Sequence, residues 1–313
     1  MKAITLSDFG GIENLVIKEL PVPVIGDSEV LVRNKAISIN PVDIKTRKGQ
    51  SLAGALKEFM PIILGWDISG TVVETGSKVS QFKNGDDVFG LINFPGYGRA
   101  YAEYVSVPAS HLAKKPEGIT HEESAAASLA ALTAWQVLKE KVKIKQGDKV
   151  LIHAAAGGVG HYAVQIAKYL GATVFGTASE RNRDFVISLG ASVHIDYEKS
   201  AFENEISDID FVLDTIGGQY IDRSLKVLRP GGTIVCIPSA ASQGIEEKAA
   251  AMGLTGSKFL VQSDGNNMKE IALLLSEGHL KSYISKIYSF DQVQEAHLQI
   301  ETAKTKGKIV LSI

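Results

Sequence analysis

The spacing of hydrophobic and polar positions changes along the chain, and the change divides the sequence into two parts. Up to about residue 118, short runs rich in β-branched residues alternate with Pro, Gly and Asp turns, which is the pattern of strands. These runs are KAITLSDFG, LVIKEL, EVLVRNKAISI, IILGWDISGTVVETG, DDVFGLI and AYAEYVSVP. We predict an antiparallel, barrel-like domain for this first part.

From Thr120 onward the pattern becomes helical and then alternates between strands and helices. Thr120 and Glu123 have the spacing of a capping box at the start of the Ala-rich segment HEESAAASLAALTAWQVLKEKV. Strands are expected at KVLIHA, ATVFGTA, SVHID, IDFVLDT and GGTIVCIP, with helices at 158–170, from about 180, near 200 and at 218–228. Such alternation predicts a doubly wound α/β fold with a parallel sheet.

The segment LIHAAAGGVGHYAVQIAKYLGA places a glycine cluster between a predicted strand and a predicted helix. A helix N-terminus offers unpaired amides and a partial positive charge, and glycine lets a phosphate approach the backbone closely. The pattern Ala155-x-Gly157-x-x-Gly160 is G-x-G-x-x-G with its first glycine replaced, and it predicts dinucleotide binding. A tight strand-to-helix connection without a ligand is the alternative.

Four predicted strand ends agree on one location for a ligand. Doubly wound sheets bind ligands beyond the carboxyl ends of their strands, at the point where the strand order reverses. The glycine turn, the segment after Thr177, the stretch DTIGG at 214–218 and the stretch IPSA at 237–240 all follow predicted strands. The residues expected to border the cofactor there are Ala156, Gly157, Gly158, Val159, Gly160, Thr215, Ile216, Pro238 and Ser239.

The end of the second strand of this alternating part bears on the choice of cofactor. NAD enzymes carry an Asp or Glu about twenty residues after the glycine motif, where its charge would repel a phosphate. Here the sequence is VFGTASERNR, with Ala178 at that place. Ser179 and Arg181, with Arg183 as a further candidate, can bind a 2′-phosphate, which favours NADPH. The alternative is that SERNR is a solvated first helical turn capped by Ser179, and Glu180 fits either interpretation.

Composition and charge exclude several classes of protein. The net charge is −2, the calculated pI is about 6.4, and the basic residues are scattered, so no nucleic-acid partner is expected. No apolar stretch is long enough to span a bilayer and the N-terminus does not look like a signal peptide, so we expect a soluble, cytoplasmic protein with no membrane partner. The single cysteine, Cys236 in GTIVCIP, excludes an intramolecular disulfide and is expected to be a core thiol.

Nearly the whole chain resembles the medium-chain dehydrogenases/reductases, in the zinc-independent quinone oxidoreductase group that includes enone (alkenal and alkenone) reductases. The segment GDKVLIHAAAGGVGHYAVQIAK is similar throughout to the signature of that group. Further similarity lies in ISINPVDIKTRKG, GWDISGTVVETG, AYAEYV, LTAWQVL, LRPGGTIV and KGKIVLSI. The resemblance implies a GroES-like antiparallel β-barrel domain at residues 1–119 and a Rossmann doubly wound parallel-sheet domain at 120–263. A C-terminal return to the first domain would follow at 264–313.

The same resemblance implies an active site in the cleft between the two domains. It places Thr133 of LTAWQ beside the nicotinamide, although a helix-interior Thr bonded to its own backbone is the alternative. It also allows a homodimer formed through a strand near SKFLVQS.

Two positions depart from the zinc-bearing alcohol dehydrogenases that this family includes. Asn40 stands where those enzymes carry a metal-binding Cys, and Trp66 stands where they carry a ligand His. An indole cannot bind zinc, and the structural-zinc lobe with its four cysteines is absent, so we predict a metal-free enzyme. No pair of histidines has ligand spacing, and loop or helix-surface roles are expected for His111, His121, His153, His161, His194, His279 and His297.

Without zinc to lower the pKa of an alcohol, reduction is the expected direction of the reaction. NADPH would supply the hydride, and the small-molecule acceptor would be a quinone or the C=C bond of an α,β-unsaturated carbonyl compound. A non-catalytic NADPH-binding protein, with a redox-sensing or structural role, is the alternative.

The segment NPVDIKTRKG supplies the candidate catalytic groups. Asn40 is expected to cap a helical turn that starts at Pro41, with Lys45 on the face of Pro41 and Asp43 pointing elsewhere. By resemblance the segment lines the cleft, where Lys45 would donate to the substrate carbonyl. Asn40 and Asp43 complete the polar set. The alternative for Lys45 is a solvated charge in the run Lys45, Arg47, Lys48.

Two aromatic residues are candidates for the substrate pocket. Tyr97 belongs to the glycine-flanked loop NFPGYGRAYAEY, and Trp66 offers a large apolar surface. Packing within the loop or the core is the alternative for both.

Overall fold

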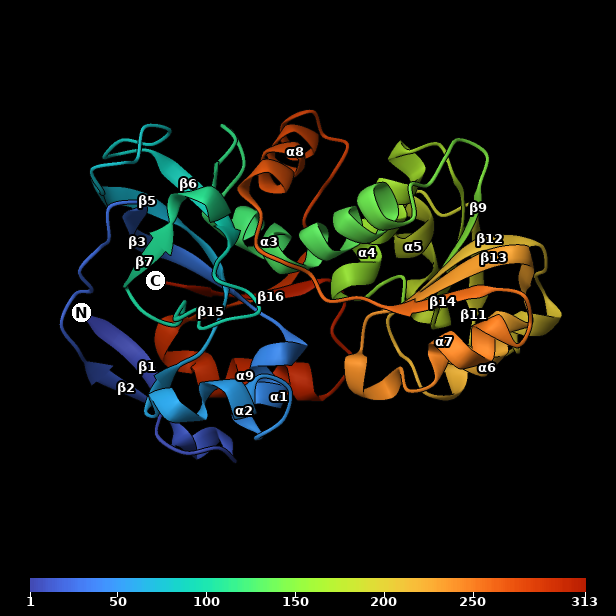
Figure 1. Cartoon of the computed structure of the whole chain (residues 1–313), viewed down its shortest axis with the longest axis horizontal. Coiled ribbons are helices and arrows are strands. Elements are labelled where there is room, and N and C mark those ends of the chain that lie inside the picture. Colours follow the sequence, from blue (N-terminus) through green and yellow to red (C-terminus); the bar gives the residue numbers. More distant parts are fainter. The chain divides into compact units, whose positions relative to one another are not determined.

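The computed structural model describes residues 1–313, except for the side chain of Ser239. The chain divides into two compact units, Met1–Leu132 with Val261–Ile313, and Thr133–Leu260 (Figure 1). Helix α3 (His121–Trp135) crosses the division between Leu132 and Thr133. The domain boundaries expected after residues 119 and 263 lie near the edges of these units without coinciding with them, and they stay predictions.

The first unit contains two sheets. One has the strand order β15-β16-β3-β5-β6-β8, with β7 also paired to β3, and the other has the order β2-β1-β4. All pairs are antiparallel except that of β15 with β16. The strands are β1 (Lys2–Leu6), β2 (Leu15–Glu19), β3 (Glu29–Ile39), β4 (Ile62–Ile63), β5 (Asp67–Thr75), β6 (Asp87–Leu91), β7 (Tyr104–Pro108), β8 (Ala113–Lys114), β15 (Ile284–Ser289) and β16 (Lys308–Ser312).

The last strand of the chain completes the larger sheet beside the candidate catalytic segment. β16 pairs with β3 so that Ile309 lies opposite Ile39, and α1 follows β3 directly. Helices α1 and α9 lie side by side in this unit (Figure 1). Its helices are α1 (Pro41–Arg47), α2 (Ala53–Leu56), α3, α8 (Gly265–Ser276) and α9 (Val293–Glu301), with 3-10 turns η1 (Ile12–Asn14), η2 (Lys57–Phe59), η3 (Ala109–His111) and η8 (Phe290–Gln292).

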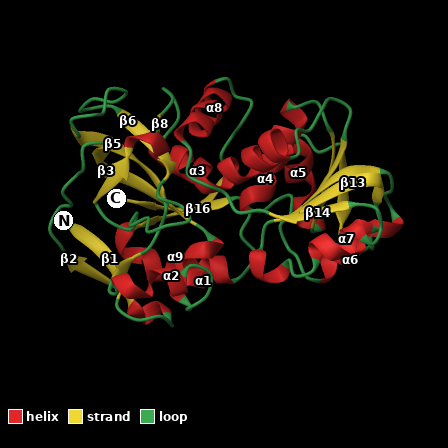
Figure 2. Cartoon of the chain, in the orientation of Figure 1, coloured by secondary structure: helices red, strands yellow, loops and turns green.

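The second unit is a six-stranded parallel sheet in the order β11-β10-β9-β12-β13-β14. This order reverses at β9, which confirms the predicted doubly wound fold and puts the switch point at the end of that strand. Helices α4 and α5 cover one face of the sheet and α6 and α7 cover the other (Figures 1 and 2). The strands are β9 (Lys149–Ile152), β10 (Thr173–Ala178), β11 (Val193–Asp196), β12 (Ile209–Asp214), β13 (Leu228–Cys236) and β14 (Thr255–Lys258).

The helices of the second unit differ in small ways from those predicted. The helix expected over 218–228 is α6 (Gln219–Leu225), because Leu228 already pairs with Ile209 as the first residue of β13. The other helices are α4 (Gly158–Tyr169), α5 (Arg183–Leu189) and α7 (Ile245–Ala250), with the π-helix η4 (Gln136–Lys141) and the 3-10 turns η5 (Glu180–Asn182), η6 (Phe202–Asn204) and η7 (Ser239–Ala241).

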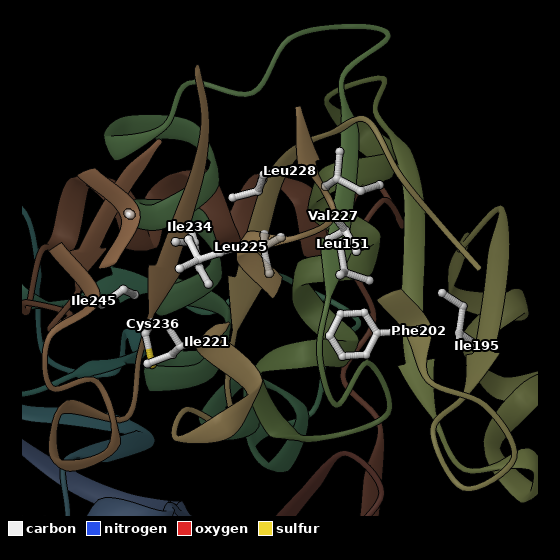
Figure 3. Close-up of a cluster of buried hydrophobic side chains, with 13 residues drawn as sticks. Leu151, Ile195, Phe202, Ile221, Leu225, Val227, Leu228, Ile234, Cys236 and Ile245 are labelled. Carbon is white, nitrogen blue, oxygen red and sulfur yellow. The ribbon is translucent and has the colours of Figure 1, made fainter. Parts of the chain in front are cut away.

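A cluster of buried apolar side chains joins the sheet of the second unit to α6 and α7 (Figure 3). Leu151 and Ile234 come from neighbouring parts of the sheet, and Ile221 and Leu225 come from α6. Cys236 belongs to the same cluster, is fully buried, and has its pKa raised to about 12 by burial. The prediction of a core thiol is therefore confirmed.

The capping box that the sequence predicts before α3 is present. The amide of Thr120 donates to the carboxylate of Glu123 over 2.9 Å, and the amide of Glu123 donates to the hydroxyl of Thr120 over 3.1 Å. At its other end α3 stops at Trp135 and the chain continues as the π-helix η4, where the sequence pattern predicts one uninterrupted helix.

Candidate functional site

The glycine turn lies at the switch point of the parallel sheet. Gly157 is the N-cap of α4 and provides no side-chain cap, so the first amides of the helix keep their donors available. A Cβ on Gly160 would lie 2.1 Å from the carbonyl oxygen of Ala154, whereas a Cβ on Gly157 would lie 3.1 Å from that oxygen. Gly160 therefore lets the helix approach the turn, and the turn presents an open helix N-terminus of the kind that binds a phosphate.

Charges at the end of β10 are distributed unevenly. The carboxylate of Glu180 accepts a hydrogen bond from Lys199 over 3.1 Å and pairs with Arg183 at 3.6 Å. The hydrogen bond from Lys199 lowers the pKa of Glu180. Arg181 is exposed and has no ion pair with any residue that the structure describes. The acidic charge at this strand end is thus neutralised, and one guanidinium stays available.

Ser179 lies next to Arg181 at the same strand end. It is the N-cap of η5, but its hydroxyl makes no capping bond to the backbone and instead accepts a hydrogen bond of 3.2 Å from the side chain of Asn182. The hydroxyl therefore retains its hydrogen for a further partner. The alternative in which Ser179 serves as a side-chain cap does not describe this turn.

The ends of β12 and β13 form two further turns at this edge. Asp214 accepts hydrogen bonds from the amides of Ile216 and Gly217 over 2.8 and 2.9 Å, which fixes the turn after β12. Thr215 donates 2.8 Å to the carbonyl oxygen of His153, and the side chain of Ile216 is 37% exposed. Pro238 is half-buried after β13, and the predicted side-chain contact of Ser239 lies outside the described part of the chain. Thr133 is a buried residue of α3.

Asn40 is held by a network of buried charges in the first unit. Its side-chain amide donates 2.7 Å to Asp67, and its side-chain oxygen accepts a hydrogen bond from the ammonium of Lys308. Lys308 also donates 3.1 Å to the carbonyl oxygen of Ile39 and lies 3.8 Å from Asp67. The other oxygen of Asp67 accepts from the amide of Leu129 over 2.8 Å. The Asn40 side chain therefore donates one hydrogen bond to Asp67 and accepts one from Lys308.

Asp43 serves the local structure of α1. Its carboxylate accepts the amide of Asn40 over 2.7 Å in a capping box, and the hydroxyl of Tyr101 lies 3.1 Å from the same oxygen. That hydroxyl also lies 3.1 Å from Nε2 of His297 in α9. The sequence correctly predicts Asn40 as the N-cap and Pro41 as the first helical residue. Asp43 is fully buried, so its side chain acts on the helix that carries it.

The three basic residues of α1 and its C-cap differ in their partners. Arg47 and Lys48 both pair with Glu301 of α9, the latter at 2.7 Å, and Arg47 is almost completely buried. Lys45 is exposed and forms no ion pair in the described structure. Lys45 thus differs from Arg47 and Lys48, and its exposure without an ion pair agrees with both a catalytic donor and a solvated surface charge.

Burial shifts the pKa values of the charged groups around Asn40 and Asp43. It raises the pKa of Asp43 to about 7 and that of Asp67 to about 6, the latter in spite of the nearby Lys308 ammonium, and it lowers the pKa of Lys308. Burial also lowers the pKa of His297 to about 3, so this histidine is neutral. The first unit thus contains carboxyl groups that titrate closer to neutrality than exposed ones.

Contacts of both aromatic candidates, Trp66 and Tyr97, hold the loop that carries Tyr97. Trp66 is buried, donates 2.7 Å from its indole nitrogen to the carbonyl oxygen of Gly96, and meets Phe94 edge to face. Tyr97 stacks on Phe59, and its hydroxyl accepts a hydrogen bond of 3.0 Å from the amide of Ile63. These contacts show how the loop is held, and a role of either residue in substrate binding stays a prediction.

The expectation of loop or helix-surface positions is wrong for His161 and His297, whereas His153 lies in a turn, as expected, but is buried. His153, His161 and His297 are fully buried, because each lies on an element that packs into its unit: after β9, in α4 and in α9. Among the residues that the structure describes, no group of three or more His, Cys, Asp or Glu side chains is arranged to hold a metal ion. No described helix has the length and apolar character needed to cross a membrane.

Several residues that contact the predicted site residues were not expected from the sequence. Asp67, Tyr101 and Lys308 all lie in segments that resemble the family, GWDISG, AYAEYV and KGKIVLSI, but nothing local indicates that they meet at α1. A charged residue inside an otherwise apolar strand, such as Lys308 before IVLSI, is the available signal of a buried pair.

A parallel dinucleotide-type sheet joined to an antiparallel sheet that the C-terminal strands complete defines the medium-chain dehydrogenase/reductase fold. Two family models match the chain: an alcohol dehydrogenase GroES-like domain matches residues 26–117, within the first unit, and a zinc-binding dehydrogenase domain matches residues 189–311, which include parts of both units. The structure of the quinone oxidoreductase from Coxiella burnetii superposes with a TM-score of 0.95 at 37% identity, covering 100% of this chain and 99% of that one.

Two curated plant proteins match almost the entire chain. The 2-methylene-furan-3-one reductase of Solanum lycopersicum and the chloroplastic NADPH-dependent alkenal/one oxidoreductase of Arabidopsis thaliana are each 33% identical over 321 residues, covering 99% of this chain and 79% of theirs. The chain belongs to the medium-chain dehydrogenase/reductase superfamily, within the group of quinone oxidoreductases and alkenal/one reductases.

Proposed function

We propose that this protein is a zinc-independent, NADPH-dependent oxidoreductase that reduces a quinone or the C=C bond of an α,β-unsaturated carbonyl compound by hydride transfer. The observation that carries the proposal is the network of Asn40, Asp67 and Lys308. It directs Asn40, which stands where zinc-bearing members of the family have a metal-binding Cys, at protein partners, and one of these is the ammonium of Lys308. The side-chain oxygen of Asn40 is thus occupied by an ammonium and the indole of Trp66 supplies no ligand, which supports chemistry without a metal.

The second unit has the features that a bound pyridine dinucleotide requires. The open N-terminus of α4 would hold the diphosphate, with Gly157, Gly158 and Val159 as the closest backbone, and Ala156 and Gly160 shape the turn. Thr215 and Ile216 would border the cofactor from β12, and Pro238 and Ser239 from β13. Thr133 would lie beside the nicotinamide, as the family resemblance implies. When bound, the reduced nicotinamide supplies the hydride.

The charge distribution at the end of β10 favours NADPH over NADH. A 2′-phosphate needs positive or neutral donors, and Arg181 is unpaired while Lys199 and Arg183 neutralise Glu180. The hydroxyl of Ser179 would be a second donor to the phosphate. The Arabidopsis relative is named as NADPH-dependent, which agrees with this choice.

In the first unit, Lys45 is proposed as the electrophilic group. An exposed, unpaired ammonium on α1 can donate a hydrogen bond to the substrate oxygen and stabilise the enolate-like charge that develops. Asn40 and Asp43 would contribute by fixing the start of α1 through their capping box. Trp66 and Tyr97 would support the pocket from the loop that they stabilise.

A homodimer formed through the edge of the parallel sheet is also proposed. β14 pairs with β13 on one side, and no strand in the described structure pairs with its other side. An exposed strand edge can pair with the same edge of a second copy. The mass in solution, measured by light scattering, would be that of two chains, and a monomer at all concentrations would contradict this part of the proposal.

The function is tested by steady-state kinetics on the purified protein. NADPH is mixed with a panel of quinones and enones, the absorbance of the reduced cofactor is followed, and zinc is determined by elemental analysis. Turnover with at least one conjugated acceptor in zinc-free protein is expected. NADPH binding without turnover across the panel would favour the non-catalytic alternative, and activity that follows the zinc content would contradict the metal-free mechanism.

A further inference from the structure

His153 is a buried histidine that lies directly before the glycine turn and has no place among the predicted cofactor residues. It follows the last residue of β9, Ile152, and its side chain is 0% exposed. Burial, reinforced by the positive charge of Arg223, lowers its pKa to about 3. The imidazole is therefore neutral, with one donor and one acceptor nitrogen.

Both ring nitrogens of His153 are used within the second unit. Nδ1 lies 3.0 Å from the hydroxyl of Thr177 in β10, and Nε2 lies 2.9 Å from the hydroxyl of Ser224 in α6. The ring also meets Phe202 and Tyr220 edge to face, at 4.7 and 5.2 Å between centroids. Phe202 is part of the apolar cluster under the sheet (Figure 3). The orientation of the ring is thus fixed from four sides.

The hydroxyl of Thr177 connects this ring to the glycine turn. It also accepts a hydrogen bond of 3.3 Å from the amide of Ala154. Ala154 has a φ of 47°, in the left-handed region that a non-glycine residue adopts only when its surroundings hold it there. The carbonyl oxygen of Ala154 accepts the amide of Gly157 over 2.8 Å and is the group that Gly160 approaches. The position of Ala154 therefore determines the shape of the phosphate-binding turn.

The backbone of His153 connects it to a further turn. Its amide donates 3.1 Å to the carbonyl oxygen of Leu213 in β12, and its carbonyl oxygen accepts the hydroxyl of Thr215 over 2.8 Å. Thr177 itself lies two residues before Ser179, at the strand end proposed to bind the 2′-phosphate. One residue thus contacts the segments after β9, β10 and β12, which are three of the turns that border the proposed cofactor site.

We propose that His153 is a positioning residue whose side chain holds the turns after β9 and β10 in register through the hydroxyl of Thr177, while its backbone contacts the turn after β12. The inference rests on the proposed function, because it assumes that these turns bind NADPH. Without the hydroxyl of Thr177, the amide of Ala154 loses its side-chain acceptor while Ala154 stays in a left-handed conformation. The turn then relaxes, and its amides lose their alignment. The affinity for the whole cofactor then falls, along with the affinity for its adenosine end.

The test uses two substitutions of Thr177, one that removes the hydroxyl and one that keeps it. Thr177→Val keeps the shape of the side chain and removes the hydroxyl, whereas Thr177→Ser keeps the hydroxyl. The Kd for NADPH, measured by fluorescence titration, should rise about tenfold or more in Thr177→Val and stay within about twofold in Thr177→Ser. The inhibition constant of adenosine 2′,5′-bisphosphate should change in parallel.

His153→Phe provides the second arm, since it keeps an aromatic ring against Phe202 and removes both hydrogen bonds. It should weaken NADPH binding as Thr177→Val does, and the double variant should be no weaker than either single variant, because both break one chain of contacts. A control is Ile195→Val in the apolar cluster, which should lower the midpoint of urea unfolding and leave the Kd within about twofold.

The outcomes separate this inference from the proposed function. Failure of the parent protein to bind NADPH would overturn the proposed function itself. Binding by the parent together with an unchanged Kd in Thr177→Val, or an equal loss in Thr177→Ser, would overturn the positioning role and leave the proposed function intact. If His153→Phe does not fold, the Thr177 pair still decides the question.

Discussion

The two units support their candidate residues with buried polar groups of opposite kinds. Behind α1 in the first unit lies a charged set, in which Lys308 faces Asp67 and Asp43 caps the helix. Behind the glycine turn in the second unit lies a neutral set, in which His153 bonds to the hydroxyls of Thr177 and Ser224. The first set joins segments up to 268 positions apart in the sequence, and the second joins the ends of β9 and β10 to helix α6.

This difference has consequences for stability and for pH dependence. A buried charge pair is weakly stabilising as a whole but costly to break, since the remaining charge stays in a medium of low dielectric constant. A neutral network loses only hydrogen bonds when one member is removed. We therefore expect the first unit to be sensitive to single charge removals and the second to respond mainly through cofactor affinity. The two sets should contribute to the pH dependence of stability with opposite signs.

The largest effect is expected from breaking the charged set of the first unit. Lys308→Met leaves Asp67 buried without its cation and Asn40 without a donor, so the free energy of unfolding should fall by about 3–5 kcal/mol in urea titrations. Adding Asp67→Asn removes the uncompensated charge, and the double variant should recover a large part of the loss. Equal instability of the single and double variants would show that the charge pair is not the cause.

The next largest effect concerns catalysis by α1. Lys45→Met should lower kcat with an enone on the order of 10²-fold, because a donor to the developing oxyanion is lost, while the Kd for NADPH stays unchanged. Lys48→Met is the matched control from the same basic run, since Lys48 pairs with Glu301, and its kcat should stay within about twofold. If the two variants behave alike, Lys45 is a surface charge, and Asn40 or backbone amides must be considered as the donor.

A smaller effect is expected for the cofactor preference of the second unit. Arg181→Ala should lower kcat/KM for NADPH by about tenfold, the value of one charge-assisted hydrogen bond, and leave kcat/KM for NADH unchanged. Arg183→Ala, which removes a residue already paired with Glu180, should have little effect on either cofactor. A parent protein that prefers NADH would contradict the assignment of this strand end.

The last prediction concerns the slope of stability with pH between pH 4 and 6. The raised pKa of Asp43 means that the folded state keeps a proton which the unfolded state has lost, so this group makes stability fall as pH rises. The lowered pKa of His153 has the opposite sign, because the unfolded state binds a proton that the folded state does not. Asp43→Asn should therefore make stability rise more steeply with pH, and His153→Phe less steeply.

Each of these slope changes should approach about 1.4 kcal/mol per pH unit, which corresponds to one proton. Urea midpoints at pH 4, 5 and 6 measure them. Slope changes of the same sign in both variants would contradict the contrast between the two units.

Features that depend on neighbouring residues were predicted from the sequence. The doubly wound sheet follows from the alternation of strands and helices, the open turn of Gly157 and Gly160 follows from its place between a strand and a helix, and the Asn40 cap follows from the proline after it. In each case the signal and its consequence lie within a few turns of chain.

Features that depend on distant residues were not predicted. Lys308 is 268 positions from Asn40, and His297 is 196 positions from Tyr101, so neither contact leaves a local pattern. The burial of His153 was not expected, because burial of an imidazole depends on whether a tertiary contact can satisfy both nitrogens. A functional residue can often be predicted from its local sequence. The residues that position it depend on tertiary contacts and cannot.

The most direct test of the account follows the hydride itself. NADPH deuterated at the transferring position of C4 is incubated with the protein and an enone that the panel shows to be reduced, and the product is examined by NMR. We predict one deuterium at the β-carbon of the saturated product, with the α-proton taken from solvent. Deuterium at the carbonyl carbon of an allylic alcohol, or a reduced product without deuterium, would contradict hydride transfer to the activated double bond.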